Sequence, residues 1–169
     1  MKPFSYAVWL VPCAEQCDEL QQTIDSLAIR FDTPSFMPHT TLCSGFWKGS
    51  ETELIEQINQ LQPKLPIELA ANDIDWTDHW STFFFLKLAG AEDLSKQAEK
   101  LIEDSHLPKV GPHLSLLYGT KNISMDRNAI RAALNVPPAI TFDALTLARP
   151  QTGRWQDVKF WEILKTTDN

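Results

Sequence analysis

The 169-residue sequence predicts an α+β fold of two similar halves, each ordered β-α-β-α-β, whose antiparallel or mixed sheets face a central cleft. Strand-like and helix-like segments alternate along the chain. The pattern occurs twice at matching distances: Trp9 lies 30 residues before His39, and Phe84 lies 29 residues before His113. Neither a G-x-G-x-x-G nor a Walker phosphate loop accompanies the alternation, which disfavours a parallel doubly wound sheet.

Local signals support each element of the first half, about residues 1–77. Runs of β-branched and aromatic residues indicate strands, and Leu and Ile at helical spacing indicate helices. Ser50 and Glu53 form a capping-box pattern at the start of the second helix. In chain order we expect a strand at 5–12, a helix at 14–30, a strand at 38–46, a helix from Ser50 and a strand at 67–76.

The second half, about residues 81–169, repeats this order. Ser124 lies 11 residues after His113, as Ser50 lies 11 residues after His39, so Ser124 is expected to open a helix. The repeat indicates an internal duplication with a pseudo-twofold axis inside a single domain. The expected elements are a strand at 82–89, a helix at 91–106, a strand at 112–119, a helix at 124–135, a strand at 139–148 and a closing strand at about 156–165.

Two short motifs of the form His-x-(Thr/Ser)-Leu carry the chemistry. They begin at His39 and at His113, each directly after a proline. Alternation along a strand puts His39 and Thr41 on one face, and likewise His113 and Ser115. Across a pseudo-twofold axis these faces converge on one groove that holds two imidazoles and two hydroxyls. The leucines of the motifs point away from it: Leu42, Leu114 and Leu116.

This set of groups suits the cleavage of a cyclic phosphodiester. One imidazole takes a proton from the attacking water and the other gives a proton to the leaving oxygen, since histidine exchanges protons near neutral pH. The hydroxyls of Thr41 and Ser115 bind the non-bridging phosphate oxygens, where negative charge develops. Protons and hydrogen bonds suffice for this chemistry, so we expect neither a metal nor a cofactor. The acidic loop around Asp73 and Asp78 is read as a solvated surface.

Other residues near the motifs have less specific signals. His106 is expected near a helix end, and His79 in a surface loop. Cys43, by alternation, shares the face of His39 and Thr41. Aromatic residues that could stack on a base are Phe46, Trp47, Trp76, Trp80 and Trp155, whereas core positions are expected for Trp9, Phe84 and Trp161.

Composition limits the partners. Lys and Arg number 15 against 22 Asp and Glu, a net charge of −7, which disfavours binding to a long nucleic-acid duplex. No apolar run is long enough to span a membrane, and the first residues lack the apolar core of a secretory signal. Three cysteines are an odd and small number, typical of a reducing compartment. We expect a cytoplasmic monomer that acts on a small cyclic phosphate.

The paired motifs resemble those of the two-histidine (2H) phosphoesterase superfamily. Within it, the residues Tyr6–Pro12, Pro38–Leu42 and Pro112–Gly119 most resemble the cyclic phosphodiesterases. The resemblance covers nearly the whole chain and implies two α+β lobes around a water-filled cleft. It also implies hydrolysis of ADP-ribose 1″,2″-cyclic phosphate to the 1″-phosphate, and of nucleoside 2′,3′-cyclic phosphates to 2′-phosphates.

By position, the resemblance makes His39 and His113 the acid/base pair and Thr41 and Ser115 the phosphate ligands. His113 would activate water, and His39 would protonate the leaving oxygen. It also places Tyr118 in the pocket. Strict alternation from Ser115 turns Tyr118 away from the groove, so this role requires the strand to end or bend near Gly119. Two alternatives stay open: a 2′,3′-cyclic phosphodiesterase or 2′–5′ ligase-like enzyme acting on RNA ends, and a non-catalytic nucleotide- or RNA-binding module.

Overall fold

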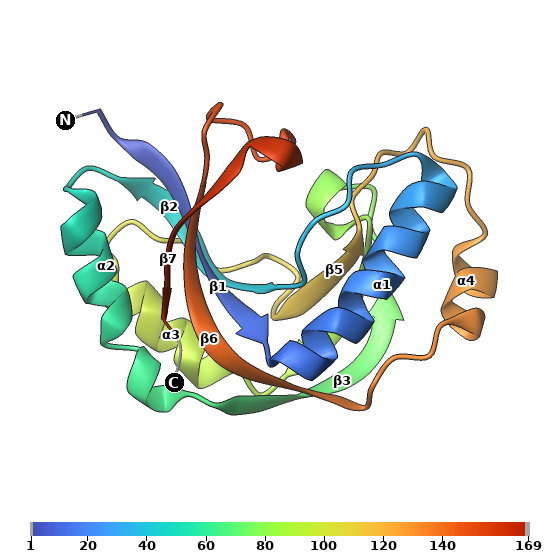
Figure 1. Cartoon of the computed structure of the whole chain (residues 1–169), viewed down its shortest axis with the longest axis horizontal. Helices are drawn as coiled ribbons and strands as arrows, with labels where there is room; N and C mark the ends of the chain where they lie inside the picture. The colour runs from blue at the N-terminus through green and yellow to red at the C-terminus, as the bar shows by residue number, and fades with distance from the viewer. Residues whose placement is uncertain (1, 168–169) are drawn as a thin grey trace.

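The computed structural model describes residues 2–167 (Figure 1). Its strands are β1 (Phe4–Pro12), β2 (Thr40–Trp47), β3 (Ile67–Asp75), β4 (Phe84–Ala89), β5 (His113–Leu117), β6 (Ala139–Pro150) and β7 (Trp161–Thr167). Its α-helices are α1 (Ala14–Phe31), α2 (Glu51–Asn59), α3 (Glu92–Leu101) and α4 (Arg127–Ala133). Short 3-10 turns occupy Gln62–Lys64 (η1), Trp80–Thr82 (η2) and Val158–Phe160 (η3).

All strands belong to one antiparallel sheet in the order β1-β2-β5-β4-β3-β6-β7, and β1 also pairs with β6. Six strands therefore close into a ring, and β7 extends from β6. The two halves occupy equivalent places in this ring: exchanging β1 with β4, β2 with β5 and β3 with β6 leaves the set of neighbouring strand pairs unchanged. The α+β fold predicted from sequence is confirmed, with a closed sheet at its centre.

The register of the sheet relates the two motif strands. Trp9 pairs with Thr41, and Phe85 pairs with Ser115. Phe85, rather than the Phe84 chosen by sequence spacing, is therefore the partner equivalent to Trp9. Each motif strand has a register shift directly after this pair, which leaves Leu42 and Leu116 as the extra residues of two matching β-bulges.

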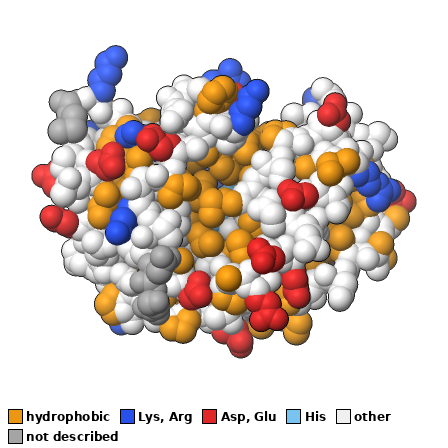
Figure 2. All heavy atoms as spheres, viewed as in Figure 1, with side chains coloured by type: hydrophobic (Ala, Val, Ile, Leu, Met, Phe, Trp, Pro, Cys, Tyr) orange, Lys and Arg blue, Asp and Glu red, His pale blue; other side chains and the backbone are white. Residues whose placement is uncertain are grey.

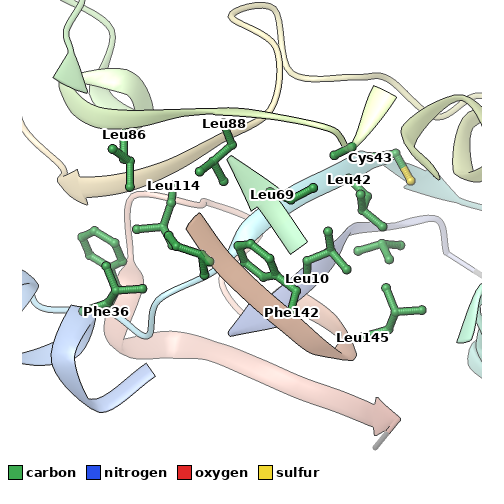
Figure 3. Packing of buried hydrophobic residues seen from close by; sticks show 14 of the residues in the cluster. Leu10, Phe36, Leu42, Cys43, Leu69, Leu86, Leu88, Leu114, Phe142 and Leu145 are labelled. Carbon is green, nitrogen blue, oxygen red and sulfur yellow. The ribbon is translucent and has the colours of Figure 1, made fainter. Parts of the chain in front are cut away.

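The core fills the space enclosed by the strands and under the helices. Figure 3 shows side chains from several strands meeting there, among them Leu10, Leu42, Leu114 and Phe142, which are all fully buried. Helix α1 contacts β5 of the other half, and α3 contacts β2. The core faces of the motif strands are thus covered by helices, as predicted for the motif leucines, and the opposite faces are left for a site.

Some local expectations are wrong. The helix expected to extend to residue 106 ends at Leu101, and His106 pairs through its backbone with Ser44 beside β2. Helix α4 is capped by Asp126, which accepts a hydrogen bond from the Ala129 amide, rather than by Ser124. The capping box of α2 is confirmed in both of its hydrogen bonds. Within residues 2–167, no helix combines the length and the apolar character needed to cross a membrane.

Candidate active site

A cleft of about 280 Å³ brings the two motifs together. His39, directly before β2, and Thr41 in β2 line it, and His113 and Ser115 line it from β5, as predicted from the sequence. The remaining walls come from β1, η2, the segment before β5 and the loop between β6 and β7. On the face shown in Figure 2, where no histidine side chain is visible, hydrophobic side chains gather near the centre and most Lys and Arg side chains lie nearer the edge.

Both motif histidines are held by the same backbone contact. The Nδ1 of His39 lies 2.7 Å from the carbonyl oxygen of Met37, and the Nδ1 of His113 lies 2.9 Å from that of Gly111. A carbonyl oxygen only accepts, so Nδ1 carries the proton in each ring and Nε2 is free to take one. An aromatic ring packs on each imidazole: Trp9 stacks on His39 at 3.9 Å, and Phe85 meets His113 edge-on at 5.3 Å.

Burial keeps both imidazoles neutral. It lowers the pKa of His39 to about 4, against the raising effect of the Met37 carbonyl, and the charge of nearby His113 lowers it further. Burial also lowers the pKa of His113, again opposed by a carbonyl, that of Gly111.

The two bulges decide which residues after each motif face the cleft. Because one extra residue shifts the alternation, Ser44 and Tyr118, each five residues after its histidine, line the cleft. Cys43 turns into the core, where it is fully buried (Figure 3). Its predicted place on the face of His39 is therefore wrong. The bulge at Leu116 and the end of β5 at Leu117 place Tyr118 in the pocket, as the resemblance implied and as its role required.

Tyr118 links the two motifs. Its ring lies between Phe36, stacked at 3.9 Å, and Trp80, stacked at 4.3 Å. Its hydroxyl lies 3.4 Å from Nε2 of His39, a long distance for a hydrogen bond. Burial raises the pKa of Tyr118, although a hydrogen bond with Ser115 opposes the shift, so the phenol keeps its proton at neutral pH.

The stacked ring, rather than the hydroxyl, should carry most of the stabilisation from Tyr118. We expect Tyr118→Phe to lower the free energy of unfolding by no more than about 1.5 kcal/mol, the scale of one hydrogen bond. Tyr118→Ala empties the space between Phe36 and Trp80 and should cost about 3–5 kcal/mol. Urea unfolding of both variants measures the difference, and equal losses would contradict this division.

The two motif hydroxyls differ in their present partners. The Ser115 hydroxyl donates to the Ser81 carbonyl oxygen at 2.6 Å. None of the described residues hydrogen-bonds to the hydroxyl of Thr41, which is half-buried in the cleft wall. Thr41 can therefore donate to a ligand at once, whereas Ser115 must first turn its proton away from Ser81.

Aromatic residues form much of the cleft wall. Of the sequence candidates, Trp80 and Trp155 line the cleft, whereas Trp76 packs against Phe84 and Phe46 is 65% exposed on the outside. Trp47 does not line the cleft either. Trp9 and Trp161, expected in the core, both line the cleft and contact each other at 5.2 Å. Trp9 is also buried in a small core cluster with Ala7 and Ala148, so its predicted burial is confirmed. Trp9 pairs directly with Thr41, and paired residues point to the same face of a sheet, so Trp9 faces the cleft as Thr41 does.

His79 is exposed but also lines the cleft. Its Nδ1 accepts a hydrogen bond from the Ser81 amide at 3.4 Å and lies 3.1 Å from the Ser81 hydroxyl, which orients the ring. The carboxylates of the acidic loop pair with cations: Asp73 with Arg131, Asp75 with Lys87 and Asp78 with Arg127. Within residues 2–167, no group of three or more His, Cys, Asp or Glu is arranged to hold a metal ion.

Solved structures share this fold. No family model matches the chain, and no curated protein matches it. LigT of E. coli, crystallised with 3′-AMP, is 16% identical with a TM-score of 0.56, and the match covers 99% of this chain and 98% of LigT. The same protein with ATP gives a TM-score of 0.52 at the same identity and coverage. A phosphoesterase gives 0.54 at 16% identity, over 98% of each chain. The fold predicted by resemblance, that of the two-histidine phosphoesterases, is thereby confirmed.

Proposed function

We propose that this chain hydrolyses cyclic phosphodiesters on small nucleotides, with His39 and His113 as its acid/base pair. The observation that carries the proposal is the matched pair of imidazoles lining one cleft. In each, the carbonyl of the residue two positions earlier fixes the proton on Nδ1. Each histidine is also followed, two residues later, by a hydroxyl side chain that lines the same cleft. A single structural histidine needs no such counterpart across the sheet.

The reaction follows from these groups. Water attacks phosphorus, the P–O3′ bond of a 2′,3′-cyclic phosphate breaks, and the 2′-phosphate results. One Nε2 takes the proton of the water while the other imidazole, protonated, gives a proton to O3′. The Thr41 hydroxyl, and that of Ser115 once turned from Ser81, donate to the non-bridging oxygens. For ADP-ribose 1″,2″-cyclic phosphate, the equivalent cleavage leaves the 1″-phosphate.

The aromatic wall supports a nucleotide as the ligand. Trp80 and Trp155 offer exposed ring surface in the cleft, and stacking of a base on such a ring contributes about 1–3 kcal/mol. LigT, which has the same fold, was crystallised with ATP and with 3′-AMP. A nucleotide whose base stacks on this wall would bring its ribose phosphate to the histidine pair.

An RNA-end 2′,3′-cyclic phosphodiesterase or 2′–5′ ligase-like enzyme is the second candidate, supported by the likeness to LigT. Such a substrate presents further phosphates beyond the reacting one. Three of the cations near the motifs pair with carboxylates instead: Lys48 with Asp104, Lys87 with Asp75, and Arg149 with both Glu51 and Glu162. With a net charge of −7, the chain also disfavours a long polyanion. We therefore favour the small nucleotide.

The test is hydrolysis in excess EDTA of 2′,3′-cyclic nucleotides, ADP-ribose 1″,2″-cyclic phosphate and a short RNA with a cyclic end, with products identified by ³¹P NMR. We expect turnover that EDTA does not reduce, fastest on the small substrates. Turnover of the RNA alone would favour the second candidate. Binding without any turnover would leave the non-catalytic module.

The pH profile adds a second readout. The profile of kcat/KM reports the free protein, in which both histidines have lowered pKa values. We expect a bell-shaped curve whose maximum lies below pH 6.5, more acidic than the neutral optimum expected for two exposed histidines. A curve with only one limb would contradict the acid/base pair.

A further inference from the structure

We propose that this cleft selects phosphate groups that carry a single negative charge and excludes doubly charged phosphomonoesters. The inference rests on the proposed function, because it takes the histidine pair as the place where the phosphate binds. It names the chemical class of ligand that the site holds, a phosphodiester monoanion. It also predicts that the enzyme releases its own product, a phosphomonoester, without help from a cation.

The lining of the cleft carries the inference. Among residues 2–167, no Lys, Arg, Asp or Glu lines it. Its titratable side chains are His39 from directly before β2, His79 from the turn before η2, His113 from the start of β5 and Tyr118 from directly after it. The remaining wall is largely aromatic, with Trp9 from β1 and other tryptophans from η2, the β6–β7 loop and β7.

Several charged side chains adjoin the cleft but do not line it. Lys87 of β4 is the direct sheet partner of His113, and its ammonium group forms an ion pair with Asp75 at 3.5 Å. Lys109 follows the lining residue Pro108, and Arg154 precedes the lining residue Trp155; both are exposed. Asp78, next to His79, lies 3.8 Å from Arg127. The lining of the phosphate site therefore offers hydroxyls and neutral imidazoles, and the adjacent cation Lys87 is already paired with a carboxylate.

This environment penalises a second charge on the ligand. The cost of removing an ion from water rises steeply with its charge, and only a paired opposite charge offsets it fully. His39 is buried and His113 is half-buried, and burial lowers the pKa of both imidazoles, so they do not supply that charge at pH 8. A cyclic phosphodiester is a monoanion at every pH near neutrality, whereas a phosphomonoester loses its second proton with a pKa of about 6.

Two ligands that differ by one methyl group isolate this effect. 2′-Deoxyadenosine 3′-phosphate becomes a dianion above about pH 6, whereas its 3′-methyl ester stays a monoanion, and neither can form a 2′,3′-cyclic phosphate. Quenching of tryptophan fluorescence reports binding, since Trp9, Trp80, Trp155 and Trp161 line the cleft. The ratio of the two Kd values cancels the protonation of the free protein, which is the same for both ligands.

We expect the two Kd values to agree within about threefold at pH 5, where both ligands are monoanions. At pH 8 the monoester should bind at least tenfold more weakly than the methyl ester. Equal or tighter binding of the monoester at pH 8 would overturn the inference, and so would failure of the methyl ester to bind at millimolar concentration. Hydrolysis of cyclic phosphates, measured separately, shows whether the proposed function holds in either case.

A variant with an added charge tests the cause. Gln156 lines the cleft and is exposed, so its replacement should not disturb folding. At about 10 mM salt, where screening extends over roughly 30 Å, the charge in Gln156→Arg should act more strongly on the dianion. The pH 8 ratio should then fall at least threefold, while the uncharged Gln156→Met keeps the wild-type ratio. Equal ratios in both variants would show that charge is not the basis of selection.

Discussion

Replacing either motif histidine with alanine is expected to lower kcat for 2′,3′-cyclic nucleotide hydrolysis by about 10²–10⁴, the usual contribution of a positioned acid or base. The double variant should lose far less than the product of the two losses, because the pair acts as a unit. His106→Ala is the matched control, since His106 is exposed and lies outside the cleft. A loss of less than tenfold in His39→Ala or His113→Ala would contradict the assignment.

A substrate with sulfur at the leaving position separates the two roles. A 3′-thiolate leaves without a proton, so the variant that lacks the acid should recover on a 2′-O,3′-S-cyclic phosphorothiolate, while the variant that lacks the base should not. The resemblance to cyclic phosphodiesterases predicts recovery in His39→Ala. Recovery in His113→Ala instead would make the more deeply buried His39 the base. The lowered pKa of His39 agrees with that role, because a base must be unprotonated before the reaction. Recovery in neither variant would contradict general acid catalysis.

Mild acid should destabilise the fold through His39. Its folded-state pKa of about 4 lies below the value of about 6.5 in an unfolded chain, so the unfolded chain binds the proton first as the pH falls. The contribution of the neutral, buried His39 to the stability of the fold is complete above pH 6.5 and is lost as the pH falls toward 4. Between pH 7.5 and 5 this loss amounts to about 2 kcal/mol. His113, whose pKa is also lowered, acts in the same direction.

Urea unfolding at a series of pH values from 7.5 to 5 measures this loss, mostly above the range in which carboxylates titrate. In His39→Gln the side chain stays neutral at every pH. Between pH 7.5 and 5 the free energy of unfolding of this variant should therefore fall by about 2 kcal/mol less than that of the wild type, even if the variant is less stable throughout. His106→Ala should keep the wild-type pH dependence. An equal pH dependence in His39→Gln and the wild type would show that His39 is not held neutral by burial.

Local patterns in the chain were sufficient for the elements and for the motif residues. Hydrophobic periodicity located the strands and helices, and the capping box of α2 lies where Ser50 and Glu53 predict it. Alternation over the three residues from each histidine to its hydroxyl placed all four motif side chains correctly, because no bulge interrupts that interval. Such signals depend only on near neighbours, which a single sequence displays.

Only the tertiary structure decided what depends on pairing between distant strands. The bulges at Leu42 and Leu116 reverse the alternation, so Tyr118 faces the cleft and Cys43 faces the core, the opposite of strict parity. Likewise Trp9 and Trp161 became cleft walls, because β1, β6 and β7 are neighbours in the closed sheet. A bulge is set by the partner strand and by the packing on both faces of the sheet, so residues adjacent in sequence give no local sign of it.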